Sequence, residues 1–345
     1  MRAHNQVQTM KKKSIIILFA GVAAAFVAIA ASRYSKGTSV DEEVQTETAA
    51  VGPQFSEDSA YAFCAAQCQF GPRVMNSKAH DDCAAWIVKK FRQYGMDVIE
   101  QKAELLGWDK RILHNNNIIA QYRPDVQDRI MICAHWDSRP WADNDPDEAN
   151  HHTPVMAAND GASGVAVMLE LARLISHNDS LDLGIDFICF DTEDYGVPQW
   201  SDSSYDGDSW AMGAQYWSKH LHREDYTARF GILLDMVGGE GARFYQETGS
   251  MQYAPEVVSK VWNAAQAAGY ATVFPFTMGG GVVDDHVPVN ENAGIPCIDI
   301  INYYPDCEQS SFGPVWHTIH DTMDHIDRNT LKAVGQTLVQ VIYSE

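Results

Sequence analysis

The chain has 345 residues, 46% of them hydrophobic, which is enough apolar material for a large core and excludes an intrinsically disordered protein. Its formal net charge of −21 excludes nucleic acid as a partner, because neutralising phosphates requires clustered Lys and Arg. Basic or neutral substrates fit this charge better. The seven cysteines form no CxxC pair, so no structural zinc site is expected, and whether any disulfide forms stays open.

The N-terminal segment, residues 1–32, is predicted to direct export. Lysines at 11–13 precede an uncharged apolar run at 14–32, close to the roughly 17–20 residues that span a membrane. The lysines are expected to stay in the cytoplasm, and the rest of the chain is expected to cross the membrane and to be periplasmic or otherwise extracytoplasmic. Cleavage by signal peptidase and retention as an inner-membrane anchor both remain open. Residues 33–54 are polar and acidic and predict a linker, leaving 55–345 as one globular domain.

The rest of the chain alternates helical and strand-like patterns. Helical periods ended by glycine or proline predict helices at 56–68 and 77–94. Short apolar runs bounded by polar residues predict buried strands, with further helices between and after them. The strands are expected at 117–122, 130–133, 185–190, 231–234 and 297–301, and the later helices at 165–175, 255–268 and 329–343. This alternation indicates an α/β protein, in which residues 138–158 form a loop at one end of the sheet.

Acidic and histidine residues stand just past three of the predicted strands. His135 and Asp137 follow the second strand, Glu193 and Asp194 follow the third, and Asp235 follows the fourth. Any one of them alone is more often a helix cap or a turn residue. Their repetition beside several strand ends instead favours a functional site, since loops at strand ends usually build one.

Two further residues complete a plausible metal site. Asp160 lies in the turn ANDGASG before a predicted helix, and His317 follows Trp316 before the last helix; alone, they are typical of a cap and a surface residue. With one carboxylate of the adjacent pair Glu193 and Asp194 they form a three-ligand set for zinc that leaves the fourth position open for water or substrate. Because neighbouring side chains diverge, one of Glu193 and Asp194 can hold the metal while the other serves as general acid/base. The spacing does not decide which.

Seven segments of residues 55–345 carry a family resemblance. They are AHWDS (134–138), NDGASG (159–164) running into VMLELA (167–172), FDTED (190–194), LLDM (233–236), VDDHVP (283–288), GIP (294–296) and WHT (316–318). In this order they resemble the animal-type glutaminyl-peptide cyclotransferases, or glutaminyl cyclases, and their bacterial relatives within the zinc aminopeptidase superfamily. The resemblance implies a three-layer α/β sandwich, in which a central mixed, mostly parallel β-sheet is flanked by helices.

The resemblance also assigns roles by position. It implies one zinc ion bound by Asp160, Asp194 and His317, with Glu193 as the general acid/base. A second set of residues would support them: Asp235 and Asp284 through a hydrogen-bond network around the general base, and Trp200 and Trp316 as walls of the substrate pocket.

The chain departs from the animal cyclases at several positions. Asp194 replaces their Glu as a ligand, and Asp299 stands where they have a His. Their disulfide near the site is not reproduced, because Cys133 is offset and the partner segment carries Gly164 and Val165. The loop before Trp200 is one residue longer.

The implied activity is cyclisation of the N-terminal glutamine of peptides or proteins to pyroglutamate, with release of ammonia. The strongest alternative is a two-zinc aminopeptidase of the same superfamily, because His135 and Asp235 stand where its second-metal ligands stand, beside Asp160. A catalytically inactive binding ectodomain on a membrane anchor is a third hypothesis. The intact set of Glu193 and the three zinc ligands argues against it.

Overall fold

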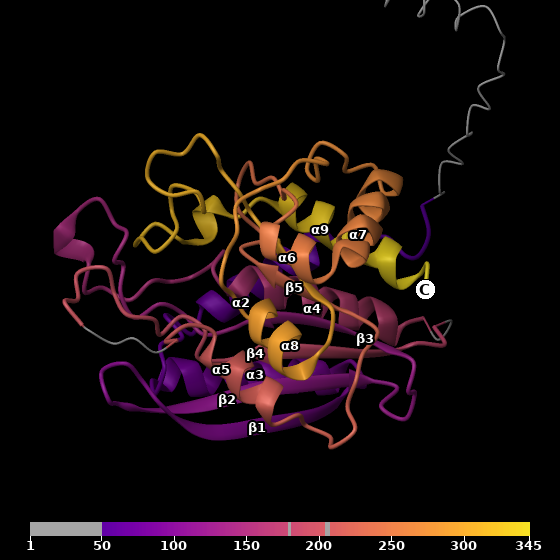
Figure 1. Ribbon diagram of the computed structural model, residues 1–345, viewed down its shortest axis with the longest axis horizontal. Coiled ribbons are helices and arrows are strands. Elements are labelled where there is room, and N and C mark those ends of the chain that lie inside the picture. The colour runs from indigo at the N-terminus through magenta and orange to yellow at the C-terminus, as the bar shows by residue number, and fades with distance from the viewer. Residues whose placement is uncertain (1–49, 179–180, 204–207) are drawn as a thin grey trace, which may run out of the picture. The chain divides into compact units, whose positions relative to one another are not determined.

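A six-stranded sheet with the order β1-β2-β4-β3-β5-β6 forms the centre of the computed structural model, which describes residues 50–178, 181–203 and 208–345 (Figure 1). The strands are β1 (Asp97–Leu106), β2 (Ile112–Tyr122), β3 (Arg129–His135), β4 (Gly184–Phe190), β5 (Gly231–Asp235) and β6 (Cys297–Ile301). Neighbours from β4 to β6 pair in parallel, whereas β2 is antiparallel to both β1 and β4. The predicted mixed, mostly parallel sheet is confirmed.

Helices cover both faces of this sheet. They are α2 (Glu57–Cys68), α3 (Lys78–Gln93), α4 (Ala162–Ser176), α5 (Met212–Lys219), α6 (Thr248–Tyr253), α7 (Pro255–Ala267), α8 (His286–Ala293) and α9 (Arg328–Ile342), with short 3-10 turns η1 (Glu148–Asn150) and η2 (Met323–His325). Alternate residues of a strand point to opposite faces, so Ile132 of β3 joins one core cluster and Met131 the other. The larger cluster contains residues of α2, α3, α4, α7 and α9, and the smaller one contains residues of α5 and α8. The architecture is a three-layer sandwich.

The sequence did not predict β1 or the first half of β2. Every residue of β1 is exposed or only partly buried, so this edge strand lacks the apolar run that marks a central strand. The first half of β2 contains Asn115, Asn116 and Asn117, a residue type depleted in strands. Helices α5, α6 and α8 have six to eight residues, too few to show a helical period.

The described chain begins against the last helix. The backbone N–H groups of Val51 and Phe55 donate to the side-chain oxygens of Gln340 and Gln336 in α9, both at 2.8 Å. The predicted leader at 1–32 and most of the predicted linker lie outside the described residues. Within the described ranges, no helix is long and apolar enough to cross a membrane. All seven cysteines fall within these ranges and are free thiols.

Helix α4 approaches the sheet most closely at Gly164. A Cβ atom there would lie 2.3 Å from the carbonyl oxygen of Leu234 and 2.7 Å from the Cβ atom of Ala134. We therefore expect Gly164→Ala to lower the free energy of unfolding by roughly 1–3 kcal/mol, because backbone must shift to admit the methyl group. Urea denaturation measures this change. Ser176→Ala, at the exposed end of the same helix, serves as the control, and equal stability of the two variants would contradict the expectation.

Candidate metal centre and active site

The candidate residues meet at the carboxyl ends of the parallel strands. His135 is the last residue of β3, Asp235 is the last residue of β5, and Glu193 lies in the turn that follows β4. Asp160 comes two residues before α4, and His317 lies in the long loop between β6 and α9. Ligands of open α/β sheets bind at this edge, where the loops after successive strands face one another.

Asp160, Asp194 and His317 form a buried group of metal-donor atoms. The three residues are at most 5% exposed, and their donor atoms lie within 4.8 Å of one another. His317 Nε2 is 3.4 Å from Asp160 Oδ2 and 3.3 Å from Asp194 Oδ1. Atoms bonded to one tetrahedral zinc ion at about 2.0–2.1 Å lie roughly 3.3–3.4 Å apart. This donor set therefore fits zinc in both chemistry and spacing.

Two electrostatic features of this group favour a cation. Neither carboxylate oxygen of the buried Asp194 makes a hydrogen bond within the described part of the chain. Burial alone would lower the pKa of His317, but the charge of Asp194 above all raises it to about 10. The site thus attracts positive charge, which a proton or a metal ion can supply.

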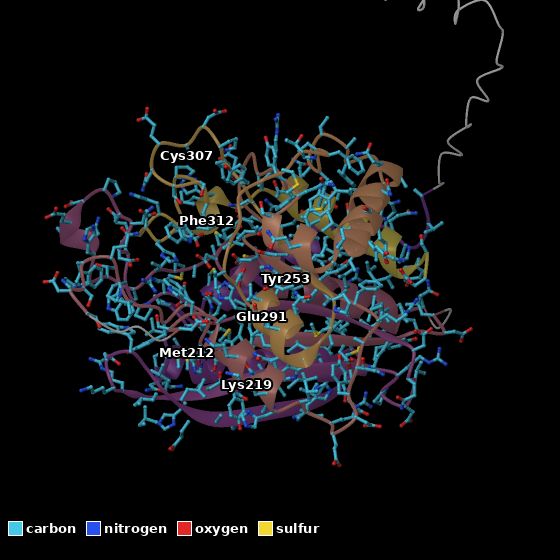
Figure 2. The ribbon with its side chains drawn as sticks, in the orientation of Figure 1. Met212, Lys219, Tyr253, Glu291, Cys307 and Phe312 are labelled. Atoms are coloured by element: carbon cyan, nitrogen blue, oxygen red, sulfur yellow. The ribbon has the colours of Figure 1, made fainter. Side chains whose placement is uncertain are left out.

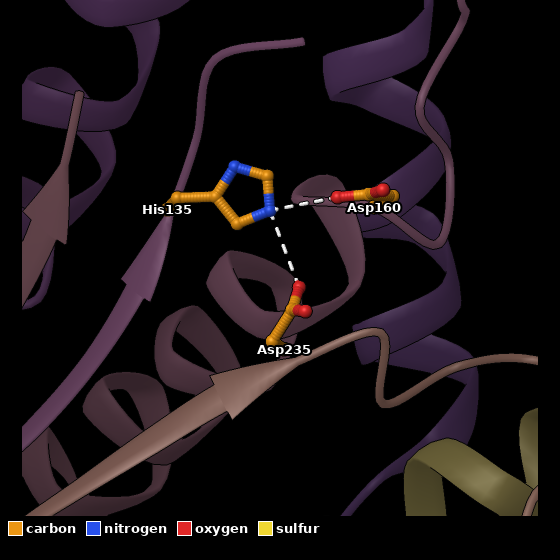
Figure 3. A group of neighbouring side chains, drawn as sticks. All are labelled: His135, Asp160 and Asp235. Atoms are coloured by element: carbon orange, nitrogen blue, oxygen red, sulfur yellow. Dashed lines mark hydrogen bonds and ion pairs between the residues drawn. The ribbon is translucent and has the colours of Figure 1, made fainter. Parts of the chain in front are cut away.

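A second group of donors adjoins the first and shares Asp160 with it. His135 Nε2 lies 2.9 Å from Asp160 Oδ1 and 3.2 Å from Asp235 Oδ1 (Figure 3). The donor atoms of these three residues also lie within 4.8 Å of one another. Burial above all raises the pKa of Asp235 to about 7. The arrangement is therefore chemically able either to take a second metal ion or to serve as a hydrogen-bonded support for Asp160.

Buried aspartates outside these groups fix the ligand segments through their backbone. Asp137 accepts hydrogen bonds from the backbone N–H groups of Glu193 and Asp194, each at 3.1 Å. Asp321 does the same for the backbone N–H groups of Asn159 and Asp160, at 2.8 and 3.0 Å. Two adjacent N–H groups bound to one carboxylate leave a segment little freedom to rotate, so both ligand turns are held in place.

A third aspartate orients the histidine ligand. Asp143 Oδ1 lies 3.3 Å from His317 Nδ1, the ring nitrogen that does not face the metal group. Arg139 holds Asp143 with two hydrogen bonds of 3.1 and 2.5 Å, and all three residues are buried. Such a carboxylate–histidine contact fixes the ring orientation of a ligand and increases its basicity.

Three residues with strained backbone lie at the same place. Thr192, Met236 and His317 have φ angles of 55°, 49° and 52°, in the left-handed region that non-glycine residues rarely adopt. Each of them is, or adjoins, a candidate site residue. Strained backbone that persists in a fold is typical of functional sites, where the surrounding contacts hold it.

A cavity of about 250 Å³ opens over the metal group. Glu193 and Asp284 line it together with Asp160, and its walls include the rings of Trp210 and Trp316. The ring of Trp316 lies 3.8 Å from that of His317, and that of Trp210 lies 6.0 Å from it on a nearly parallel plane. The site can thus hold a small uncharged group between aromatic walls, next to a metal position and a carboxylate.

Trp200, expected in the pocket wall, lies elsewhere. Its ring contacts those of Trp141, His151 and His152 within loops at 138–158 and 195–203. Trp210 stands at the cavity instead, and the sequence offered no signal for it because it precedes a short helix without a clear period. Asp143 and Arg139 were missed as well, since their partner His317 is far away in sequence.

Further buried acids stand beside the cavity. Asp285 and Asp299 are fully buried, and none of their carboxyl oxygens makes a hydrogen bond among the described residues. Burial above all raises the pKa of both, and of Glu193, well above the usual value. Asp235 hydrogen-bonds with His135, whose Nδ1 lies 3.9 Å from a carboxylate oxygen of Glu193. Asp284 accepts from the backbone N–H of Asp285 and lines the same cavity as Glu193.

The chain is similar to several known proteins. Residues 117–342, more than half of the chain, match the family model described as Peptidase family M28. The chain belongs to peptidase family M28. Among family structures, the glutaminyl cyclase of Bacteroides thetaiotaomicron bound to N-acetylhistamine is 50% identical, with a TM-score of 0.83 over 86% of this chain and 100% of that one. A Zn-dependent exopeptidase of Parabacteroides distasonis is 45% identical, also with a TM-score of 0.83, over 86% and 100% of the two chains.

A more distant relative is longer than this chain. Aminopeptidase YwaD of Bacillus subtilis is 28% identical over 229 residues. This match covers 64% of the chain but 41% of the relative, so the chain spans about two fifths of that protein. The family therefore includes both cyclases and peptidases, and the family alone does not decide between these activities.

Proposed function

We propose that this protein is a zinc-dependent glutaminyl cyclase, a glutaminyl-peptide cyclotransferase that converts the N-terminal glutamine of peptides or proteins to pyroglutamate and releases ammonia. The observation that carries the proposal is the cavity of about 250 Å³, which is lined by Glu193, by Asp160 and His317 of the metal group, and by aromatic rings. Its size, and the aromatic and aliphatic side chains among its walls, suit a glutamine side chain. The 50% identity to a glutaminyl cyclase over the whole of that chain supports the same reading.

We propose that Asp160, Asp194 and His317 would hold one zinc ion beside the cavity. When bound, zinc supplies a Lewis acid that polarises the γ-carbonyl group of the substrate. The aspartates described above hold the ligands in place before the metal arrives. No residue has to move far for the site to assemble, which favours tight binding.

Glu193 is proposed to move the proton. Glu193 takes a proton from the α-amine as the amine nitrogen bonds to the γ-carbonyl carbon. It then delivers a proton to the side-chain amide nitrogen as the bond between this nitrogen and the carbonyl carbon breaks and ammonia leaves. Its buried setting suits this role, because burial raises the pKa of Glu193 toward the working range of a general base. Asp235 and Asp284 line the same cavity as Glu193. They are proposed to support Glu193 as acidic, hydrogen-bonded neighbours.

The aromatic walls are proposed to set the substrate conformation. Ring closure joins two ends of one residue, so the main contribution of the pocket is a folded glutamine with its amine near the carbonyl carbon of the side-chain amide. Trp210 and Trp316, which both line the cavity, restrict the side chain to such a conformation and exclude water. In this role Trp210 takes the position that the resemblance gave to Trp200.

The N-terminal segment is proposed to place the enzyme outside the cytoplasm. Its lysines and apolar run suit an exported, periplasmic protein, either cleaved or anchored in the inner membrane by residues 14–32. This segment lies outside the described residues, so the proposal rests on the sequence pattern. Peptides and proteins with N-terminal glutamine in that compartment are the proposed substrates.

A two-zinc aminopeptidase is the second candidate, favoured by the additional donor group of His135, Asp160 and Asp235. A zinc titration of the metal-depleted protein separates the two. For the cyclase we expect ammonia release from a Gln-initiated peptide to rise with added zinc and to reach its plateau at one zinc per chain. A plateau at two zinc ions, with peptide-bond cleavage instead of ammonia release, would support the aminopeptidase.

The hydrogen bonds of Asp321 lead to a prediction about zinc affinity. In Asp321→Asn one carboxylate oxygen becomes an NH₂ group, which cannot accept the backbone N–H that now faces it. We expect roughly 10- to 100-fold weaker zinc binding, the size of effect seen when groups behind the ligands are altered. Competition with a chromophoric chelator measures the affinity without reference to activity. Asp324→Asn, at an exposed position of the same loop, is the control, and equal affinity of the two variants would refute the positioning role.

A further inference from the structure

A small cavity of about 40 Å³ lies beside the reactive cavity. Its lining includes Tyr245, Tyr303, Phe312 and three consecutive glycines at 279–281. Phe312, labelled in Figure 2, lies in the long loop between β6 and α9. The two cavities share Val282, Ile301 and Phe312 in their linings, so they adjoin one another.

The segment 276–283, which we call the strap, forms one wall of the small cavity and is firmly held. Gly279 N donates to Gln246 O at 2.8 Å, and Thr248 N donates to Gly280 O at 3.0 Å. The buried carboxylate of Glu247 accepts the backbone N–H of Val282 at 3.1 Å and those of the first turn of α6. The wall formed by the strap is therefore fixed by backbone hydrogen bonds, and the cavity is a defined part of the fold.

The glycines of the strap keep the cavity open. A Cβ atom at Gly279 would lie 2.9 Å from the Cβ of Tyr245, and one at Gly280 would lie 3.3 Å from the ring of Tyr303. At Gly281 the nearest atom would be Thr248 Cβ, at 3.6 Å, an ordinary contact. A side chain at 281 would thus fit the strap but occupy the cavity, which makes this position suitable for a test.

The surroundings of the small cavity are apolar and accessible. Met278 of the strap is 49% exposed, and Val283, at the mouth of the reactive cavity, is 65% exposed. The one charged residue that lines the small cavity, Glu247, is 3% exposed and accepts hydrogen bonds from backbone N–H groups. A carboxylate entering here would lose its water and would meet no residue of opposite charge in the lining, which costs several kcal/mol.

We propose that this cavity is a subsite for the side chain of the residue that follows the N-terminal glutamine, and that it selects small uncharged aliphatic side chains. The inference rests on the proposed cyclase function, since a glutamine held in the reactive cavity places the next residue at its mouth. A volume of about 40 Å³ holds roughly three water-sized groups, which is close to the heavy atoms of a valine side chain. The enzyme then prefers Gln-Val over Gln-Gly, and both over Gln-Asp.

The test compares kcat/KM for ammonia release from Gln-Gly, Gln-Val and Gln-Asp peptides of equal length. For the unaltered protein we expect Gln-Val to exceed Gln-Gly by about 10-fold, the discrimination an apolar pocket gives for a few methyl groups. Gly281→Val fills the subsite and is expected to remove this preference while leaving kcat/KM for Gln-Gly within about twofold. Tyr303→Ala enlarges the subsite and is expected to improve Gln-Phe relative to Gln-Val.

Phe276→Ser is the matched control, because Phe276 is an exposed apolar residue of the same strap that lines neither cavity. It is expected to keep the preference of the unaltered protein. Equal rates with all three peptides, or a Gly281→Val variant that loses Gln-Gly and Gln-Val activity in parallel, would overturn the subsite and leave the cyclase intact. Absence of ammonia release from every Gln peptide would overturn both.

Discussion

Glu193→Gln is expected to lower kcat for ammonia release from a Gln-initiated peptide by about 10²- to 10⁴-fold, the range typical of a lost general acid/base. Glutamine has the size of glutamate but cannot carry the proton from the amine to the leaving nitrogen. The Glu193 side chain lines the reactive cavity and is 12% exposed, with one oxygen 3.9 Å from His135 Nδ1. Its backbone N–H is held by Asp137, so the substitution should leave the turn in place.

Three further measurements separate a chemical role from a structural one. Because Glu193 is not among the proposed zinc ligands, the variant should keep its zinc content, its thermal midpoint and a KM close to that of the unaltered protein. Glu256→Gln in α7, at an exposed position far from the strand ends, should change none of these quantities. A kcat within tenfold of the unaltered protein would remove Glu193 from the mechanism.

Arg129→Met is expected to lower the free energy of unfolding by about 3–5 kcal/mol, because it leaves a buried carboxylate without its cation. Arg129 in β3 and Asp186 in β4 are 1% and 0% exposed. Two hydrogen bonds, of 2.5 and 2.7 Å, join them. Asp186 also accepts from Tyr226 and Gln121, at 2.8 Å each, so the pair is the centre of a buried polar network beside the parallel strands.

Urea denaturation of a small set of variants tests this account. The double substitution Arg129→Met with Asp186→Leu should recover part of the lost stability, since an apolar pair leaves no buried charge. Lys78→Met, which breaks an exposed ion pair with Asp82, should cost less than about 1 kcal/mol. If Arg129→Met were no more destabilising than Lys78→Met, the buried pair would not have the role assigned to it.

The sequence predicted the interior of the fold well, for a physical reason. The parallel strands β3 to β6 are buried on both faces, so they appear as short apolar runs, and chemically active residues follow directly where the runs end. His135, Asp235 and Glu193 could therefore be found from their positions in the chain. The edge strand β1 could not be found in this way, because it has no buried residues and forms a strand through its pairing with β2.

The supporting residues of the site were harder to predict. Asp143 and Trp210 contact His317 from loops more than a hundred residues away in sequence. Asp321 accepts a hydrogen bond from the backbone N–H of Asp160 across a similar separation. Such contacts exist only after the chain has folded, and no local period marks them. The preference for zinc therefore follows from the residue types, whereas the rigidity of the site is a property of the tertiary structure.

The most direct test of the central claim is the mass of the product formed from a Gln-initiated peptide. Incubation with the zinc-loaded protein is predicted to give a peptide lighter by one ammonia, in equal amount with free ammonia, and a chelator should abolish both. A peptide that begins with leucine should stay unchanged. Release of free N-terminal amino acids from either peptide, with no loss of ammonia from the Gln peptide, would contradict the account and assign the site to peptide-bond hydrolysis.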